Sequence, residues 1–328
     1  MHLATLPVGV AGGHILRHNI ADAEGRKALA KGRRLTAEDL ARLRELGVAE
    51  VRVAILEPGD VHEDEAARRL AEAACGPGVR ATAAVHSRVN LLAEADGVLE
   101  VDAAALLAVN EVDGLTVATL PGHTLVRARR RVATIKVIPF AVAEEALAMA
   151  EERARAVGPL VALRPLRPMA VGVVLVGSEA ARKRIERGVY PAIEGRVSEL
   201  GSRVTGVRYV PPDEQAVAAA LRSLRDGGGE LLIVAGETSI MDRDDVTPQG
   251  IRLAGGRVEH YGAPVEPGNL LLLAYIEERE AFTPVLGAPG CVRSRDTNIV
   301  DLLLPRLLTG ERVSRRDIVV LGYGGLLA

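Results

Sequence analysis

The sequence predicts an α/β protein in which a smaller α+β N-terminal region precedes a C-terminal, doubly wound and mostly parallel sheet. After about residue 169, buried-strand patterns alternate with amphipathic helical patterns, which is typical of a parallel sheet with helices on both faces. Before it, residues 158–168 hold three prolines, as an interdomain connector would. The length of 328 residues also exceeds the roughly 250 at which single cores stop growing. We therefore expect an N-terminal region at 1–157, a linker at 158–168 and a C-terminal domain at 169–328.

The N-terminal region gives fewer signals. Residues 36–39 indicate a helix start, and leucines at three-residue spacing give that helix an apolar face. Residues 134–139 have a strand pattern, in which Lys136 either reaches an anion or extends along the surface with its charge in water. We assign no chemistry to residues 61–157.

The alternation after residue 169 predicts the elements of the C-terminal domain in order. Before the central loop we expect strands at 170–176, 203–210 and 231–235, one or two helices at 185–200 with a break at Pro191, and a helix at 213–225. After that loop we expect strands at 270–276, 284–286 and 317–321, and a helix at 296–308.

Ligands of such sheets bind where the parallel strands end, and several loops are expected at this edge. In the first loop Gly177 allows close backbone approach, Ser178 can donate a hydrogen bond or cap a helix, and Glu179 follows. In the second, Asp213 is either a helix N-cap, the favoured interpretation, or a site carboxylate. In a later loop, 287–295, Arg293 could clamp a phosphate or be solvated.

The loop from residue 236 to residue 248 is the strongest candidate for the active site. Its strand delivers a short polar segment to a helix start, which is the usual geometry for holding an anion. The carboxylates that follow would repel a bare phosphate, so they suggest a metal ion or chemistry beside it. The polar segment comprises Gly236, Glu237, Thr238 and Ser239, the acidic cluster comprises Asp242, Asp244 and Asp245, and Thr247 is the expected helix cap.

Composition excludes several classes of function. The net charge of −2 and the aromatic content of 2% argue against nucleic acid as a partner, because such proteins use basic surfaces and stacking rings. The chain has no apolar run of the roughly 18 residues that a membrane span needs. The two cysteines make no disulfide framework, and the N-terminus lacks the pattern of a secretory leader. We therefore expect a cytoplasmic protein that contacts no membrane.

Three motifs together resemble the molybdopterin-binding domain of molybdenum-cofactor biosynthesis proteins, the MogA, MoaB and MoeA type. They are VGVVLVGSE at 171–179, VPPDE at 210–214 and AGETSIMDRDDVTP at 235–248. Their order and spacing cover about half the chain. More faintly, residues 13–20 and 31–51 are similar to the opening of MoeA-type proteins.

The resemblance implies a ligand and roles for the loop residues. Molybdopterin would bind by its terminal phosphate at Gly177, Ser178, Glu179, Gly236, Glu237, Thr238, Ser239, Thr247 and Arg293. Asp213 and Asp245 would be the catalytic carboxylates, and Asp242 with Asp245 would hold Mg²⁺. ATP and molybdate are further expected reactants, for adenylylation of molybdopterin or for metal insertion. A homo-oligomer is also implied, with molybdoenzymes or other cofactor-assembly proteins as further partners.

Two positions differ from the family pattern and keep a second hypothesis open. Glu237 stands where the family has glycine, and residues 287–291 replace a Leu-Pro-Gly-Asn-Pro segment. These differences favour a non-catalytic carrier or sensor of molybdopterin or of the finished cofactor. The intact Asp-Val-Thr-Pro segment at 245–248 favours the enzyme.

Overall fold

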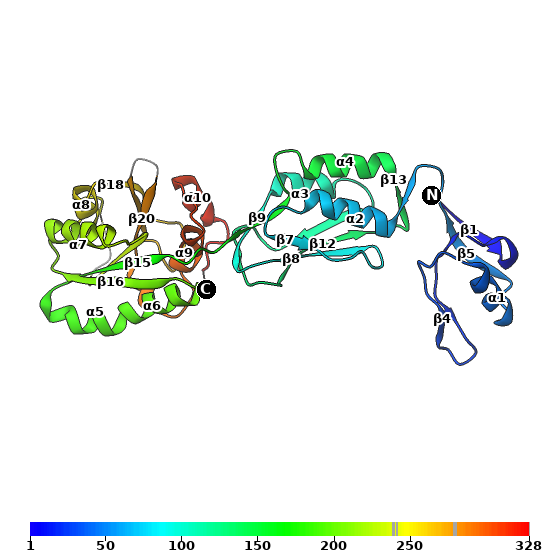
Figure 1. Cartoon of the computed structure of the whole chain (residues 1–328), viewed down its shortest axis with the longest axis horizontal. Helices are drawn as coiled ribbons and strands as arrows, with labels where there is room; N and C mark the ends of the chain where they lie inside the picture. The colour runs from blue at the N-terminus through cyan, green and yellow to red at the C-terminus, as the bar shows by residue number, and fades with distance from the viewer. Residues whose placement is uncertain (238–239, 241, 278–280, 328) are drawn as a thin grey trace. The chain divides into compact units, whose positions relative to one another are not determined.

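The computed structural model describes residues 1–237, 240, 242–277 and 281–327 of the chain. The chain divides into two compact units, Met1–Arg164 and Pro165–Ala328 (Figure 1). Each unit buries a hydrophobic cluster of its own. None of the helices in the described part of the chain combines the length and the apolar character that a membrane crossing requires.

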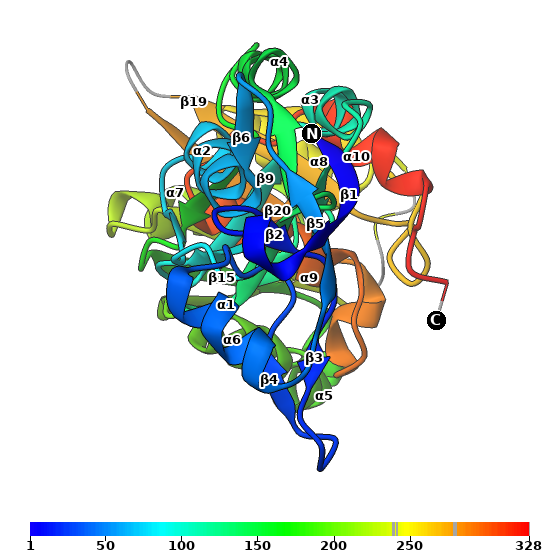
Figure 2. The same cartoon turned by 90° about the vertical axis from the view of Figure 1, so that its right-hand side faces the viewer.

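The first unit begins with a small antiparallel sheet, β1 (His2–Pro7), β5 (Glu50–Ile55) and β2 (Ile15–Leu16). Helix α1 (Ala37–Glu45) starts where the sequence predicts, because the Thr36 hydroxyl accepts the Asp39 amide and the Asp39 carboxylate accepts the Thr36 amide. Leu43 of α1 is fully buried in this small core. Strands β3 (Ile20–Ala21) and β4 (Lys27–Leu29) form a hairpin that projects from the small sheet (Figures 1 and 2).

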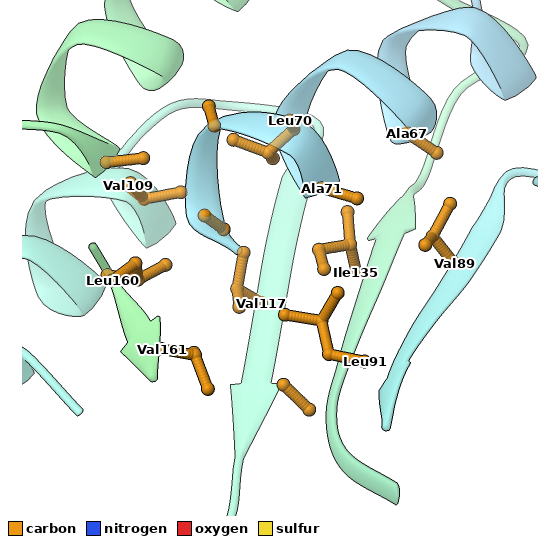
Figure 3. Close-up of a cluster of buried hydrophobic side chains, with 14 of the residues drawn as sticks. Ala67, Leu70, Ala71, Val89, Leu91, Val109, Val117, Ile135, Leu160 and Val161 are labelled. Atoms are coloured by element: carbon orange, nitrogen blue, oxygen red, sulfur yellow. The ribbon is translucent and has the colours of Figure 1, made fainter. Parts of the chain in front are cut away.

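The larger core of the first unit lies between helices and an antiparallel sheet. The sheet runs β10 (Leu115–Thr119), β12 (Arg131–Val137), β8 (Arg88–Ala93), β7 (Val79–Ala81). Figure 3 shows Leu70 and Ala71 of α2 (Glu63–Ala74) facing Leu91 and Ile135 of this sheet. Helices α3 (Ala103–Asn110) and α4 (Glu144–Ala154) extend the same cluster. The strand expected at 134–139 is the second half of β12, which ends at Val137.

Short strands complete the first unit. Strands β6 (Asp60–His62) and β13 (Ala141–Ala143) pair with each other, and β11 (Leu125–Val126), β9 (Gly97–Val101) and β14 (Val161–Pro165) form a further sheet. Strand β14 lies inside the segment expected as a linker at 158–168. Its residues are apolar enough to join the core, and Leu160 and Val161 are fully buried.

The sheet of the second unit runs β16 (Arg203–Val210), β15 (Ala170–Val176), β17 (Leu231–Gly236), β20 (Phe282–Gly287), β19 (Leu272–Glu277), β18 (Gly256–Tyr261). The first four strands are parallel to one another. Strand β19 is antiparallel to both β20 and β18, so it is the one described strand of this sheet that runs the opposite way, which confirms a mostly parallel sheet. Strands β19 and β20 are too close in sequence for the crossover of a dozen or more residues that a parallel pair needs. Consecutive residues of β15 and β17 are buried, so both faces of the sheet are covered.

Helices flank this sheet. Helices α7 (Glu214–Asp226) and α8 (Val246–Leu253) pack on alternate residues of β15 and β17 through Val217, Leu221 and Ile251. Helices α5 (Arg182–Gly188) and α6 (Tyr190–Glu199) lie on the opposite side (Figure 1). The predicted break near Pro191 is present, and Pro191 lies in the first turn of α6, where its missing N–H costs no hydrogen bond. The doubly wound arrangement stays a prediction.

Two expected elements near the C-terminus differ from the structure. The strand expected at 317–321 is wrong, because this segment forms α10 (Arg315–Val319) followed by the 3₁₀ turn η4 (Val320–Gly322). A capping box between Ser314 and Asp317 starts the helix, and only Ile318 of its apolar run is buried. Helix α9 (Ile299–Leu308) begins three residues later than the expected 296, because Asn298 is its cap.

Candidate functional site

The loops selected from the sequence meet at one edge of the C-terminal sheet. Val176, the last residue of β15, lies opposite Val210 of β16 and Gly236 of β17. On the far side of β17, Val234 lies opposite Gly287 of β20. The segments that follow these strands therefore leave the sheet side by side at its carboxyl edge, where α/β sheets bind ligands.

Gly177 allows the first of these loops to pass close to its neighbours. A Cβ atom at this position would lie 2.6 Å from the Ile185 side chain and 2.7 Å from the Tyr209 hydroxyl. That hydroxyl donates a 2.7 Å hydrogen bond to the Ser178 carbonyl. A larger residue here would force the ends of these two side chains to move. The hydrogen bond from Tyr209 holds the Ser178 backbone in position.

The carboxylate of Glu237 occupies the donors of this loop. Its Oε2 accepts hydrogen bonds from the Ser178 amide at 3.1 Å and from the Ser178 hydroxyl at 2.9 Å, and its Oε1 accepts one from Arg184 Nη2 at 2.8 Å. The Ser178 amide, and then its hydroxyl, lower the pKa of Glu237. The Glu237 side chain is therefore an anion, and it binds the Ser178 donors that were expected to bind phosphate.

The acidic loop is ordered by its own backbone. The Asp242 amide donates to Asp245 Oδ2 at 2.9 Å, and the Asp244 amide donates to Asp242 Oδ1 at 2.8 Å. The Tyr261 hydroxyl donates to the Ile240 carbonyl at 2.8 Å and fixes the other end of the loop. Asp242 and Asp245 thus lie in one turn after β17, and their expected role as magnesium ligands stays a prediction.

Thr247 does not cap the following helix, which corrects the expectation. Helix α8 begins at Val246 with Asp245 in the N-cap position, so Thr247 lies inside the first turn. Pro248 lies in that turn too, as expected. The predicted phosphate ligands Thr238 and Ser239 lie outside the described residues.

Asp213 has the cap role that the sequence favoured for it. Its Oδ1 accepts the Ala216 amide at 2.8 Å at the start of α7. Its position at the end of β16 still places it on the loop edge beside Gly177. The hydrogen bond therefore confirms that Asp213 caps α7. A chemical role of its carboxylate stays a prediction.

The remaining predicted ligands are exposed. The side chain of Glu179 is 81% exposed and lies 3.5 Å from Arg182. Arg293 is exposed in the 3₁₀ turn η3 (Gly290–Arg293) that follows β20. Neither side chain is directed by a hydrogen bond toward Glu237 or the acidic loop among the described residues.

Two arginines that sequence analysis did not select organise the site. Arg184 pairs with Glu237 across 53 residues of sequence. Arg196 donates to the carbonyls of Val292 and Ser294 at 2.8 and 2.9 Å and to Asp301 at 2.7 Å, which fixes the loop after β20. The basic cluster at 182–184 beside the Gly-Ser loop was an available signal for Arg184. No local signal marks Arg196.

The acidic turn fits a magnesium ion only in part. Among the described residues, no group of three His, Cys, Asp or Glu side chains is arranged to hold a metal. Mg²⁺ however commonly binds through one or two carboxylates, with water and substrate phosphates completing its shell. Asp242 and Asp245 offer that kind of incomplete ligand set.

Comparison with known families matches both ends of the chain. Residues 172–309 match the family described as "probable molybdopterin binding domain", which spans the carboxyl-edge loops described above. Residues 5–55 match a domain of unknown function. No curated protein matches the chain.

Solved structures of low identity are also similar to parts of the chain. The tungsten cofactor synthesizing protein MoaB from Pyrococcus furiosus is 19% identical, with 43% of this chain and 91% of that protein covered and a TM-score of 0.32. The molybdopterin biosynthesis enzyme MoaB from Thermus thermophilus is 20% identical, with 44% and 98% covered and a TM-score of 0.32. A molybdenum cofactor biosynthesis protein from Pyrococcus furiosus is 12% identical over 97% of this chain and 65% of its own length, with a TM-score of 0.25.

Proposed function

We propose that the C-terminal unit has a role in molybdenum cofactor biosynthesis and binds molybdopterin by its terminal phosphate at the carboxyl edge of the sheet. The match of residues 172–309 to the family described as a probable molybdopterin binding domain supports this proposal. At this edge the unit acts on molybdopterin or its adenylylated form, by nucleotidyl transfer or metal insertion. The observation that carries this proposal is the strand register, which supports a single site built from the loops after β15, β16 and β17.

Each loop has a proposed part in the site. The Gly236 backbone, with the Thr238 and Ser239 hydroxyls, binds the phosphate, because a strand end next to a helix start favours anions. The Gly177 amide donates to the Val210 carbonyl at 3.0 Å, so Gly177 contributes the shape of the neighbouring loop. Asp213 and Asp245 position the reacting groups. Asp242 and Asp245 would hold Mg²⁺, which supplies neutralisation of the charge that develops on transferring phosphoryl oxygens.

A non-catalytic carrier or sensor is the second proposal, and one observation favours it. The Glu237 carboxylate holds the Ser178 amide and hydroxyl and is paired with Arg184. A phosphate that used these donors would have to displace Glu237. A protein that only stores or senses molybdopterin tolerates this competition better than an enzyme that must turn over.

Titration of the full-length protein with molybdopterin, with and without Mg-ATP, separates the two proposals. An adenylylating enzyme is expected to bind molybdopterin and to release pyrophosphate when ATP is present, and a metal-inserting enzyme to release AMP when adenylylated molybdopterin and molybdate are supplied instead. The carrier is expected to bind molybdopterin without nucleotide turnover. Absence of binding under both conditions would overturn the proposed ligand.

Asp245→Asn tests the catalytic assignment. We expect turnover to fall by about 100-fold or more, the lower range for a lost acid–base or positioning group. The circular dichroism spectrum is expected to stay unchanged, since asparagine can still accept the Asp242 amide. Asp226→Asn, at the far end of α7, is the matched control and is expected to keep full turnover. Full turnover in Asp245→Asn would rule out a catalytic role.

The partners of this activity are further proposals. A molybdoenzyme or another cofactor-assembly protein would receive the product. A homo-oligomer is expected from the resemblance and can be measured by analytical ultracentrifugation.

A further inference from the structure

The N-terminal unit contains a cavity of about 600 Å³ that the proposed function does not use. It lies between the β3–β4 hairpin, the start of α2, the turn before β8 and the end of β12. Its size is within the roughly 300–1,000 Å³ typical of small-molecule sites. The residues that line the cavity are far apart in sequence and extend from Asn19 to Phe140.

The lysines of the chain gather around this cavity. Only four of the 41 basic residues are lysines, and three of them, Lys27, Lys31 and Lys136, line it together with Arg88. The fourth, Lys183, lies on α5 of the other unit. The other cations of the chain are arginines. The cavity therefore differs from the rest of the surface in presenting the compact, point-like positive charge of lysine ammonium groups.

The positive charge is not neutralised by the surrounding protein. No hydrogen bond or ion pair holds the side chains of Lys27, Lys31 or Arg88 within the described ranges. Lys136 donates to uncharged acceptors, the His86 carbonyl at 2.8 Å and the Ser87 hydroxyl. Glu63 is the acidic side chain that lines the cavity, against these four cations. A local excess of positive charge in a concave site concentrates anions.

The turn at the rim is built from residues that such a turn rarely accepts. His86 and Ser87 both have positive φ, 50° and 62°, between the paired residues Val85 and Arg88. A two-residue hairpin turn of this kind favours Asn-Gly, because glycine adopts positive φ without strain. Here the Ser87 amide donates to Asp64 at 2.7 Å and holds the strained turn. The turn thus keeps two side chains at the cavity that glycine would not provide.

We propose that this cavity binds a small molecule carrying a phosphate monoester, independently of the site on the C-terminal sheet. Lys27 and Lys31 on the hairpin and Lys136 on the sheet would contact the phosphate as point charges, and Arg88 would contribute to the same field. Since phosphate monoesters are compact dianions, this arrangement suits them better than it suits a planar carboxylate, which pairs bidentately with arginine.

The small number of lysines makes a direct measurement simple. Reductive methylation of the full-length protein with ¹³C-formaldehyde labels the four lysines and the N-terminal amine and keeps their charge. Lys→Arg variants assign each lysine signal. Inorganic phosphate is titrated at constant ionic strength against chloride. We expect the signals of Lys27, Lys31 and Lys136 to shift together along one saturating curve. Lys183 is next to Arg184 of the C-terminal site, so its signal reports phosphate at that other site. Shifts of Lys27, Lys31 and Lys136 that never saturate, or that follow separate curves, would overturn the cavity site.

Variants give a second, independent readout by calorimetric titration with phosphate. Lys31→Ala is expected to weaken the affinity of the cavity about 10-fold, the effect of losing one close charge, whereas Lys183→Ala is the matched control. Glu63→Gln is expected to strengthen binding, because it removes the opposing charge. Lys31 is exposed, so circular dichroism is expected to show an intact fold. Wild-type affinity in Lys31→Ala would contradict the proposal. Because Lys27, Lys31 and Lys136 all belong to the N-terminal unit, that result would leave the proposed function of the C-terminal unit unaffected.

Discussion

Glu237 places a carboxylate where the family pattern has glycine, and its surroundings explain how the protein accommodates it. The charge that would repel a phosphate is bound by the Ser178 amide and hydroxyl and by Arg184. The same donors that favour an external anion therefore stabilise an internal one. Under the proposed function, ligand affinity at this loop would depend on the competition between the Glu237 carboxylate and the phosphate.

Glu237→Gln is expected to tighten molybdopterin binding by roughly tenfold, because an amide competes less well for the Ser178 donors and does not repel phosphate. Equilibrium titration measures the change. Glu186→Gln, which alters an exposed acid on α5, is the control and is expected to leave the affinity unchanged. An unchanged or weaker affinity in Glu237→Gln would show that phosphate does not use the Ser178 donors.

Among the secondary-structure elements, α10 shows how a short local signal outweighs an apolar run. Residues 318–321 are all apolar and fit either a strand or a buried helix face, since short runs of this kind do not distinguish the two. The Ser314–Asp317 capping box decides for the helix. Asp317 also lies 3.0 Å from Arg306, a guanidinium that is buried on α9.

Asp317→Asn tests this helix start through its pH dependence. Burial raises the pKa of Asp317, but the Ser314 and Arg306 hydrogen bonds outweigh it, so the folded-state pKa is lowered. A lowered carboxyl pKa adds stability above the unfolded-state value near 3.9, and that stability is lost as the pH falls through the folded-state pKa.

At pH 7 we therefore expect the variant to lose about 1–2 kcal/mol of unfolding free energy, and the difference from wild type to shrink below pH 4. Urea unfolding at several pH values measures both. Asp113→Asn, at an exposed position, is the control. A loss of equal size at pH 3 and pH 7 would show that the charge of Asp317 is not responsible.

On the scale of the whole molecule, the chain separates its two proposed sites into two units with their own cores. The lysine-lined cavity is built from residues of Met1–Arg164, and the sheet-edge site from residues of Pro165–Ala328. Each unit therefore holds every described residue that its site needs.

Separately expressed fragments 1–164 and 165–328 are expected to fold, each with a cooperative thermal transition and dispersed NMR signals. The second fragment is expected to bind molybdopterin with the affinity of the full chain, and the first is not. Failure of 165–328 to fold or to bind would show that the site needs the N-terminal unit.

The sequence by itself determined the alternation of strands and helices over residues 170–236 and the loops at the carboxyl edge of the sheet, but it missed β18 and predicted a strand in place of α10. The strands at 170–176 and 203–210 match the structure because periodicity of burial is a local property of the chain. The acidic turn and the Asp213 cap were predictable for the same reason: their partners lie within three residues.

Only the tertiary structure decided which polar side chains contact each other across long stretches of sequence. Arg196 contacts Asp301 across 105 residues, Glu237 contacts Ser178 across 59, and Lys136 contacts Ser87 across 49. Such pairs depend on how strands are ordered and packed, and no local pattern records that order. Two features follow from such long-range contacts. One is the Ser178 loop, whose donors are bound by Glu237, and the other is the lysine-lined cavity.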